Sequence, residues 1–229
     1  DALMIDLSPM KSVRVDPDAK TARVEPGVVL NELDHETQQF GLATPVGYNS
    51  TTGVAGLTVG GGWGWLSRKY GLTVDNLLSA DVVTANGELV HASEEENEDL
   101  FWGIRGGGGN FGIVTSFQFR LHEVGPMVLS GPIVHPFEDT EMVLKEHRRL
   151  AAEAPDEVVV WFVIRDAPPL EVIPEEWHGE RVIILAAFYA GEMSDGEQAL
   201  QPWRDIGDPV AAVAAEDRAT ATAAVDAIE

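Results

Sequence analysis

The stretch that sets the fold reads Thr51-Thr52-Gly53-Val54-Ala55-Gly56-Leu57-Thr58-Val59-Gly60-Gly61-Gly62-Trp63-Gly64. Glycine has no Cβ, so its backbone can approach a ligand closely, and consecutive amides at a turn or helix start can bind phosphate oxygens. Thr51, Thr52 and Thr58 add hydroxyl donors. A tight loop that only packs a helix on a sheet would have the same composition. Glycine content alone does not separate the two interpretations.

A second glycine loop, Arg105-Gly106-Gly107-Gly108-Gly109-Asn110-Phe111-Gly112, contains the spacing G-x-G-x-x-G at Gly107, Gly109 and Gly112. That spacing binds a nicotinamide dinucleotide when a strand precedes it and a helix follows it. Here the predicted order is the reverse, with a helix before the loop and a strand at Ile113–Leu121 after it. We therefore do not expect a Rossmann dinucleotide loop.

The first half of the chain alternates between strand and helix patterns. Residues 12–25 predict a hairpin around Pro17-Asp18, and residues 28–40 carry a helical apolar stripe that ends at Gly41. Strands are also predicted at Leu77–Thr84 and Glu88–His91, joined by a turn at Asn86-Gly87. A short acidic helix is predicted to begin at a capping box of Ser93 and Glu96 and to reach Arg105.

The composition changes near His122–Pro126, which predicts one domain at residues 1–123 and another at 124–229. The fold class predicted is α+β, because strands and helices mix without a strict βαβ rhythm. The second half predicts strands at Val128–Val134, Val158–Ile164 and Arg181–Ala190, and helices at Glu138–Ala154, Asp195–Ile206 and Val210–Ile228.

Composition excludes several classes of function. Cysteine is absent, so disulfides and thiolate chemistry are impossible within the chain, and a reducing cytoplasm is compatible with this. The histidines show no metal-type pairing, so we expect no metal site. The net charge of −23 repels nucleic acid and anionic membranes, and no apolar run is long enough to span a bilayer.

A series of short motifs runs through the chain in a fixed order. The motifs are Asp6-Leu7-Ser8-Pro9-Met10, Gly41-Leu42-Ala43-Thr44-Pro45, Thr52-Gly53-Val54-Ala55-Gly56, Arg68-Lys69-Tyr70-Gly71-Leu72-Thr73, Asp75-Asn76, Val82-Val83-Thr84, Asp99-Leu100-Phe101-Trp102 and the second glycine loop. Taken together and in this order, they are similar to the FAD-linked oxidases of the vanillyl-alcohol oxidase superfamily, which carry a PCMH-type FAD-binding domain, in the berberine-bridge-enzyme-like branch.

The resemblance implies an FAD-binding domain of two α+β subdomains, of which this chain resembles the second, followed by the start of a substrate domain with an antiparallel sheet. The family's upstream histidine-containing loop and its downstream general base have no counterpart here, so we expect a fragment that lacks N-terminal and C-terminal parts. In some members a second covalent flavin link needs a cysteine near the position of Asn49, and this chain has no cysteine, so we expect no second link.

The resemblance also implies which residues bind FAD. These are Thr51, Thr52, Gly53, Gly56, Thr58, Gly61, Gly62, Trp63 and Gly64 along the pyrophosphate and ribityl chain, with Ile113 and Val114 against the cofactor. We interpret Arg68 and Lys69 as a surface pair beside a packed Tyr70, and Asp75-Asn76 as a turn cap. Trp63 and Trp65 either line the flavin or pack, and no catalytic residue is assigned.

The function implied is hydride transfer from a C–H bond next to a hydroxyl or amine to flavin, with an alcohol, sugar or amine as substrate and oxygen or another acceptor taking the electrons. The alternative is a non-catalytic remnant without stable flavin.

The charge gives a first prediction. Acid spread along the chain with little lysine favours a protein that works in high salt, whereas the alternative is an ordinary acidic soluble protein. Salt at 1 M screens charges beyond about 3 Å, so the self-repulsion of a −23 chain falls as salt rises. The thermal midpoint should therefore climb from low to multimolar potassium chloride. A flat or falling midpoint in that series would contradict the high-salt interpretation.

Overall fold

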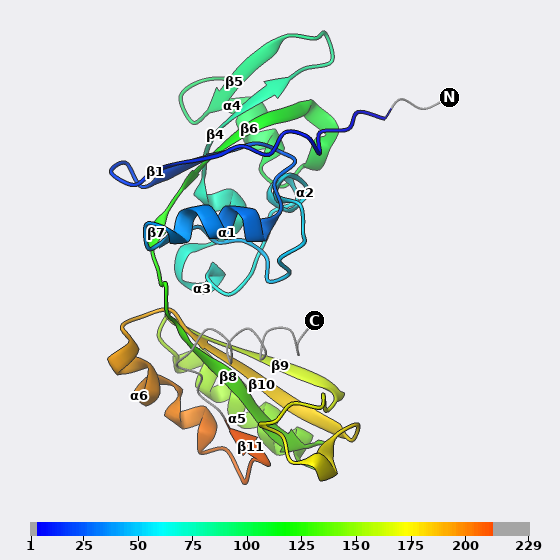
Figure 1. Ribbon diagram of the computed structural model, residues 1–229, viewed down its shortest axis with the longest axis vertical. Helices are drawn as coiled ribbons and strands as arrows, with labels where there is room; N and C mark the ends of the chain where they lie inside the picture. The colour runs from blue at the N-terminus through cyan, green and yellow to red at the C-terminus, as the bar shows by residue number, and fades with distance from the viewer. Residues whose placement is uncertain (1–3, 213–229) are drawn as a thin grey trace. The chain divides into compact units, whose positions relative to one another are not determined.

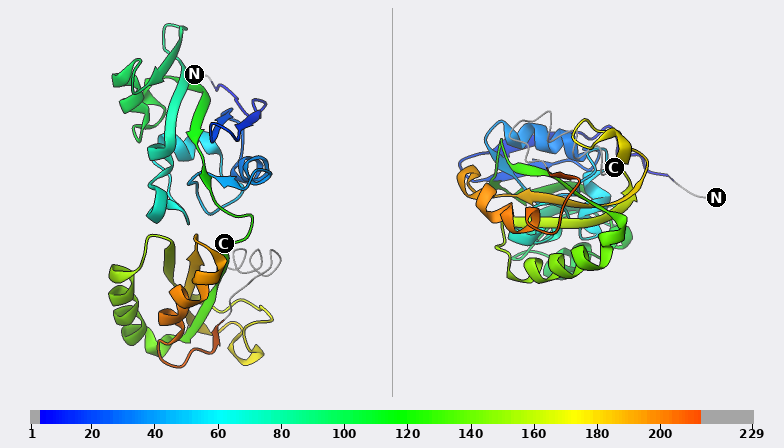
Figure 2. Two further views of the ribbon diagram at one scale, coloured as in Figure 1. Left: turned by 90° about the vertical axis from the view of Figure 1, so that its left-hand side faces the viewer. Right: turned by 90° about the horizontal axis from the view of Figure 1, so that it is seen from below.

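The chain forms two compact units in the computed structural model, which describes residues 4–212 (Figure 1 and Figure 2). The division falls between Pro126 and Met127, three residues after the boundary that the sequence suggested. Both units combine helices with antiparallel sheets, so the predicted α+β class is confirmed. No helix in residues 4–212 combines the length and the apolar character needed to cross a membrane.

Unit 1 is built on a five-stranded antiparallel sheet in the order β1-β2-β6-β4-β5. The strands are β1 (Val13–Asp16), β2 (Thr21–Val24), β4 (Leu77–Val83), β5 (Leu89–Ser93) and β6 (Ile113–Arg120). A shorter pair, β3 (Leu42–Ala43) with β7 (His122–Glu123), ties the end of the first helix to the end of the unit. The predicted hairpin and the strand of the second glycine loop are thus confirmed.

The core of unit 1 lies on one face of this sheet. Alternation along β2 explains why: Ala22 and Val24 are fully buried while Arg23 points to the other face. Helices α1 (Leu30–Gln38), α2 (Val54–Val59) and α4 (Glu98–Ile104) bury apolar side chains in the same core, which also holds Phe117 and Phe119 of β6. Two short helical turns, α3 (Ser67–Tyr70) and η1 (Thr73–Asn76), lead into β4.

The predicted Ser93–Glu96 capping box is wrong. Ser93 is still paired in β5, and its hydroxyl accepts hydrogen bonds from the amides of Glu95 and Glu96 in a turn that precedes the helix. The residue before α4 is instead Asn97, in the left-handed conformation at φ 51°. Sheet pairing holds Ser93, so the chain must first turn before a helix can begin.

Unit 2 is a four-stranded antiparallel sheet in the order β11-β8-β10-β9 (Figure 1). Its strands are β8 (Leu129–Pro136), β9 (Val158–Asp166), β10 (Arg181–Tyr189) and β11 (Ala211–Ala212). Helices α5 (Thr140–Glu153) and α6 (Met193–Arg204) share one apolar core with the sheet, through side chains such as Val143, Leu200 and Trp203. The predicted helix from Val210 is wrong at its start, where β11 pairs with β8, and the rest of it lies outside the described residues.

One buried side chain in unit 2 has no polar partner. His135 of β8 is fully buried, and neither ring nitrogen makes a hydrogen bond. Burial lowers the pKa of His135 below its usual 6.5, against the opposing charge of Asp139. Burial also lowers the pKa of His147, whose Nδ1 accepts a hydrogen bond from the indole of Trp203 at 3.2 Å.

These histidines predict how stability depends on pH. Their folded pKa values lie below 6.5, so the unfolded chain takes up protons first and the free energy of unfolding falls as the pH drops below about 6.5. Each such histidine adds a slope of up to about 1.4 kcal/mol per pH unit. His135→Leu should remove one such slope and raise the free energy of unfolding at neutral pH by about 1 kcal/mol, since an orphaned buried polar group costs about 1–3 kcal/mol.

Urea unfolding between pH 5 and pH 8 measures both effects. His35→Leu, on an exposed side of α1, is the matched control for losing an imidazole. An unchanged pH slope in His135→Leu would show that the buried imidazole is not responsible.

Candidate functional site

The first glycine loop is pinned to the start of α1 by backbone hydrogen bonds. The amide of Leu30 donates to the carbonyl of Thr52 at 3.0 Å, and the amide of Val54 donates to the carbonyl of Val28 at 2.9 Å. Upstream, the Asn49 carboxamide oxygen accepts from both the amide and the hydroxyl of Thr51, at 3.0 and 2.7 Å. The loop therefore has a fixed course before any ligand binds.

Gly53, Gly56 and Gly61 share a property that separates them from the other glycines of the loop. A Cβ built on any of the three meets no protein atom within 4 Å, so packing within the protein does not require glycine there. Gly53 and Gly56 flank the first turn of α2, which has no side-chain cap and no acidic residue. Amides at a helix start that lack a cap remain donors for an anion.

Gly62 and Gly64 are glycine for a structural reason. A Cβ on Gly62 would overlap the Thr73 side chain, and Gly62 has φ 72°, a conformation that favours glycine. A Cβ on Gly64 would overlap the carbonyl oxygen of Val46. For these two glycines the packing interpretation of the loop holds.

Thr58 is placed away from the loop surface. Its side chain is fully buried, and its hydroxyl donates to the carbonyl of Val54 one helical turn earlier, at 2.7 Å. Thr51 is exposed and Thr52 is half-buried. We therefore leave the Thr58 hydroxyl out of the candidate site and keep the two loop threonines.

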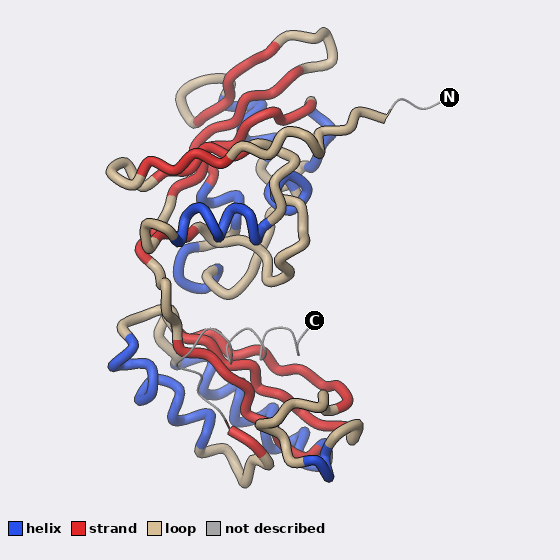
Figure 3. Tube along the Cα trace, in the orientation of Figure 1, coloured by secondary structure: helices blue, strands red, loops and turns tan. Residues whose placement is uncertain are grey.

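The structure brings the second glycine loop beside the first. The amide of Gly106 donates to the carbonyl of Val59, the last residue of α2, at 3.1 Å. A Cβ at Gly106 or Gly109, like one at Gly53, would meet no protein atom within 4 Å, whereas Gly107 lies against Phe111. Helix α4 precedes this loop and β6 follows it, which is the order that argues against a Rossmann loop (Figure 3). Ile113, half-buried, and Val114, buried in the core, begin β6.

The segment from Arg68 to Asn76 is mainly structural. Asn76 is buried; its amide nitrogen donates to the carbonyls of Tyr70 and Leu72, both at 2.9 Å, and Asp75 accepts the Leu72 amide at 2.8 Å. The predicted turn cap is confirmed. The Asn76 oxygen lies 2.7 Å from Nε2 of His122, whose ring stacks on Tyr70 at 3.9 Å.

The Asn76 amide fixes a histidine tautomer. Because its nitrogen already donates twice, its oxygen must accept, so Nε2 of His122 carries the proton. Burial lowers the pKa of His122, and the charges of Arg120 and Lys69 lower it further. This imidazole is a neutral link between the turn after α3 and β7.

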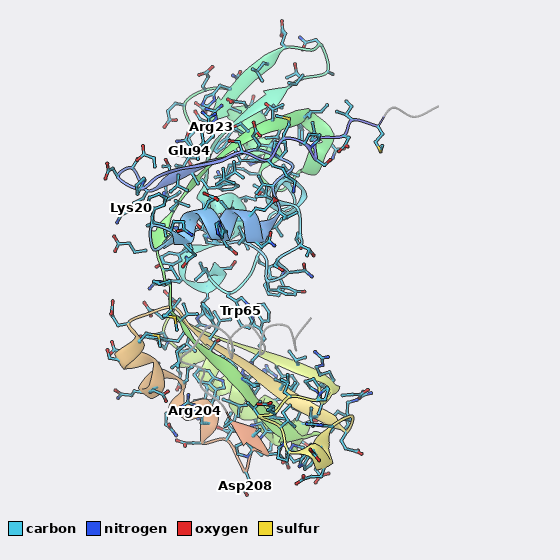
Figure 4. The ribbon with its side chains drawn as sticks, viewed as in Figure 1. Lys20, Arg23, Trp65, Glu94, Arg204 and Asp208 are labelled. Atoms are coloured by element: carbon cyan, nitrogen blue, oxygen red, sulfur yellow. The ribbon has the colours of Figure 1, made fainter. Side chains whose placement is uncertain are left out.

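The tryptophans of the first loop differ in exposure. Trp63 is 55% exposed, with its ring 5.9 Å from that of Tyr48. Trp65, whose side chain Figure 4 labels, is half-buried. Within residues 4–212, no group of three His, Asp or Glu side chains is placed to hold a metal ion.

Comparison with known proteins shows similarity to FAD-linked oxidoreductases. The family model for an FAD binding domain matches residues 1–93. An FAD-linked oxidoreductase of Dictyostelium discoideum is 35% identical over 212 residues, which cover 92% of this chain and 44% of that protein.

Solved structures agree. 6-Hydroxy-D-nicotine oxidase from Arthrobacter nicotinovorans matches with a TM-score of 0.79 and 30% identity over 92% of this chain and 45% of that one. A variant of the BBE-like 1 protein of Physcomitrella patens matches with a TM-score of 0.78 and 30% identity over 91% of this chain and 43% of that one. In sequence and in fold the chain is thus similar to FAD-linked oxidases, the berberine-bridge-enzyme-like proteins among them. Its cofactor is FAD, and the chain spans less than half the length of these relatives.

Sequence reasoning missed one residue of this region. Arg105 was read only as the end of a helix, yet its guanidinium contacts the main chain at Val74. The available signal was its position directly before four glycines. Because glycines have no side chain, a long side chain beside them can extend over the loop to a distant partner.

The open glycines generate a prediction about FAD uptake. Gly53→Val with Gly56→Val should leave the fold intact, because a Cβ at either position meets no protein atom within 4 Å, and should abolish FAD uptake by occupying the space next to the loop amides. Circular dichroism and bound-flavin absorbance, measured on the chain extended at both ends to the length of its relatives, decide this. Ala152→Val, at an exposed position of α5, adds a similar side chain away from the glycine loops and is the control. A folded double variant with stoichiometric FAD would refute the assignment.

Proposed function

We propose that the protein is an FAD-dependent oxidoreductase whose two glycine loops hold the cofactor's pyrophosphate and ribityl chain. The observation that carries this proposal is the space beside Gly53, Gly56 and Gly61, next to a helix start without a side-chain cap. A phosphate there meets amide donors and no competing carboxylate in the first turn of α2. The residues present therefore fit the anionic part of FAD.

In this proposal unit 1 is part of the FAD-binding domain and unit 2 is part of the substrate domain. The proposed contacts with FAD are Thr51, Thr52, Gly53, Gly56, Gly61 and Trp63, with Gly62 and Gly64 shaping the turn and with Ile113 and Val114 following the second loop. The exposed ring of Trp63 suits a flat aromatic partner better than a core position.

FAD supplies the redox chemistry, accepting a hydride from a C–H bond next to a hydroxyl or an amine. The protein residues position the cofactor and exclude water, and the backbone amides of the loops compensate the phosphate charge. A side-chain base must take the substrate's proton. Neither His122, whose Nε2 is engaged with Asn76, nor buried His135 suits this role.

The name of a similar protein supports the substrate class that we propose. The nicotine oxidase acts, by its name, on an amine-bearing small molecule. A small alcohol, sugar or amine is the substrate class proposed here, with oxygen or another acceptor reoxidising the flavin.

The alternative is that these 229 residues hold no flavin by themselves. The resemblance places a pyrophosphate-gripping loop with a histidine upstream of Asp6 and the general base downstream of unit 2. Each lost hydrogen bond to a charged group costs about 1.5–3 kcal/mol, so two lost bonds weaken FAD binding about a hundredfold or more. A missing base lowers turnover by roughly a hundred- to ten-thousand-fold.

The experiment compares residues 1–229 with the chain extended at both ends. Bound flavin is measured by absorbance, and dye reduction is measured with a panel of sugars, alcohols and amines. The extended chain should be yellow and reduce the dye, while residues 1–229 should bind FAD weakly and show no turnover. A colourless extended chain would overturn the proposed function, and equal turnover in both would place the whole active site within these residues.

A further inference from the structure

Arg105 connects the two glycine loops through its side chain. It follows α4 directly and precedes Gly106. Its Nε donates to the carbonyl of Val74 at 3.2 Å, and its Nη2 lies 3.7 Å from a carboxylate oxygen of Asp75. The guanidinium also lies over the ring of Phe101, at 5.3 Å from the ring centre. Three contacts, with Val74, Asp75 and Phe101, therefore hold this side chain.

The segment that Arg105 holds in turn holds the first glycine loop. Val74 and Asp75 belong to η1, and the amides of Thr73 and Val74 donate to the carbonyls of Gly62 and Gly61 at 2.9 and 3.0 Å. Neither glycine has a side chain that could anchor the loop, and the amide of Gly61 donates to the carbonyl of Thr58 in α2 at 3.0 Å. The position of Gly61 is therefore set by α2 on one side and by η1 on the other.

The main chain beyond Arg105 completes a ring of contacts. The amide of Gly106 donates to the carbonyl of Val59 at 3.1 Å. The path runs from Val59 through Gly61 and Gly62 to η1, from η1 to the Arg105 guanidinium, and from Arg105 through Gly106 back to Val59. Removing the guanidinium breaks one link of this ring and leaves the hydrogen bonds within the helices and the sheet in place.

We propose that Arg105 is a positioning residue that fixes the two glycine loops as one surface for FAD. It acts through η1 and Gly106 and need not touch the cofactor. A lysine has a single ammonium and cannot donate to a carbonyl and face a carboxylate with the fork geometry of a guanidinium. The inference rests on the proposed function for its ligand, but the link between the loops stands in the protein without FAD.

The test uses Arg105→Ala and Arg105→Lys in the 229-residue chain and in the chain extended at both ends. The amides of Thr73, Val74 and Gly106 bridge the ring, so their hydrogen exchange reports on it directly. In Arg105→Ala, exchange at these amides should rise at least tenfold while exchange in β2 and β6 stays unchanged. The FAD dissociation constant of the extended chain should rise at least tenfold, with Arg105→Lys intermediate. Millimolar methylguanidinium should partly restore Arg105→Ala and leave the unsubstituted chain unaffected.

Two further variants separate positioning from charge and from general stability. Arg149→Ala, on the surface of α5 with Glu146 and Glu153 as its partners, removes the same charge and should change neither readout. Asp75→Asn keeps the Arg105–Val74 hydrogen bond and should weaken FAD binding less than threefold. Unchanged exchange at all three amides, or unchanged FAD affinity in Arg105→Ala, would overturn the proposal.

The outcomes also separate this inference from the proposed function. If the unsubstituted extended chain took up no FAD, the proposed function would fail, and the role of Arg105 toward FAD would fail with it. If that chain bound FAD and Arg105→Ala bound it equally well, only the inference about Arg105 would fail.

Discussion

Close approach of backbone to backbone at glycine is the constraint on which unit 1 depends. A Cβ at Gly27 would overlap the carbonyl oxygens of Leu7, Ser8 and Met10, and one at Gly112 would lie 2.7 Å from the carbonyl oxygen of Val83. A Cβ at Gly64 would lie only 2.0 Å from the carbonyl oxygen of Val46. These glycines let loops cross at distances that no side chain tolerates, and they fix where the open glycines lie.

The contrast between the two kinds of glycine carries the functional argument. Gly53 and Gly56 have no neighbour that excludes a side chain, although glycine within a helix, as at Gly56, costs about 0.5–1 kcal/mol relative to alanine. Gly61 also has open space beside it, but its φ of 113° itself favours glycine. Packing within the protein does not explain why Gly53 and Gly56 are glycine. A ligand that must approach the backbone closely would explain why these positions are glycine, and the family's FAD is such a ligand.

Local patterns predicted most of the elements because the forces behind them are local. The β2 alternation of Ala22, Arg23 and Val24 follows from one buried face, and the turn chemistry of Pro17-Asp18 needs only neighbours in sequence. The failures came from contacts distant in sequence. Ser93 was read as a helix cap, but pairing with Ser79 keeps it in the sheet, and Ala211 looked helical until its pairing with Val134 is considered. The contact of Arg105 was not predicted for the same reason, because its partner Val74 lies 31 residues away in the sequence. Within the site, Thr58 was chosen for its hydroxyl, and only the helix that uses this hydroxyl shows why it is buried.

The central claim is that the open glycines form the FAD surface, and one measurement addresses it directly. Amide chemical shifts of the isotopically labelled chain are followed as FAD is added. The account predicts that the largest shifts fall on the amides of Gly53, Ala55, Gly56 and Gly61, with smaller ones at Gly106 and Gly109, while those of Gly27 and Gly64 stay in place. Saturable FAD binding that leaves the first four amides unchanged would contradict it.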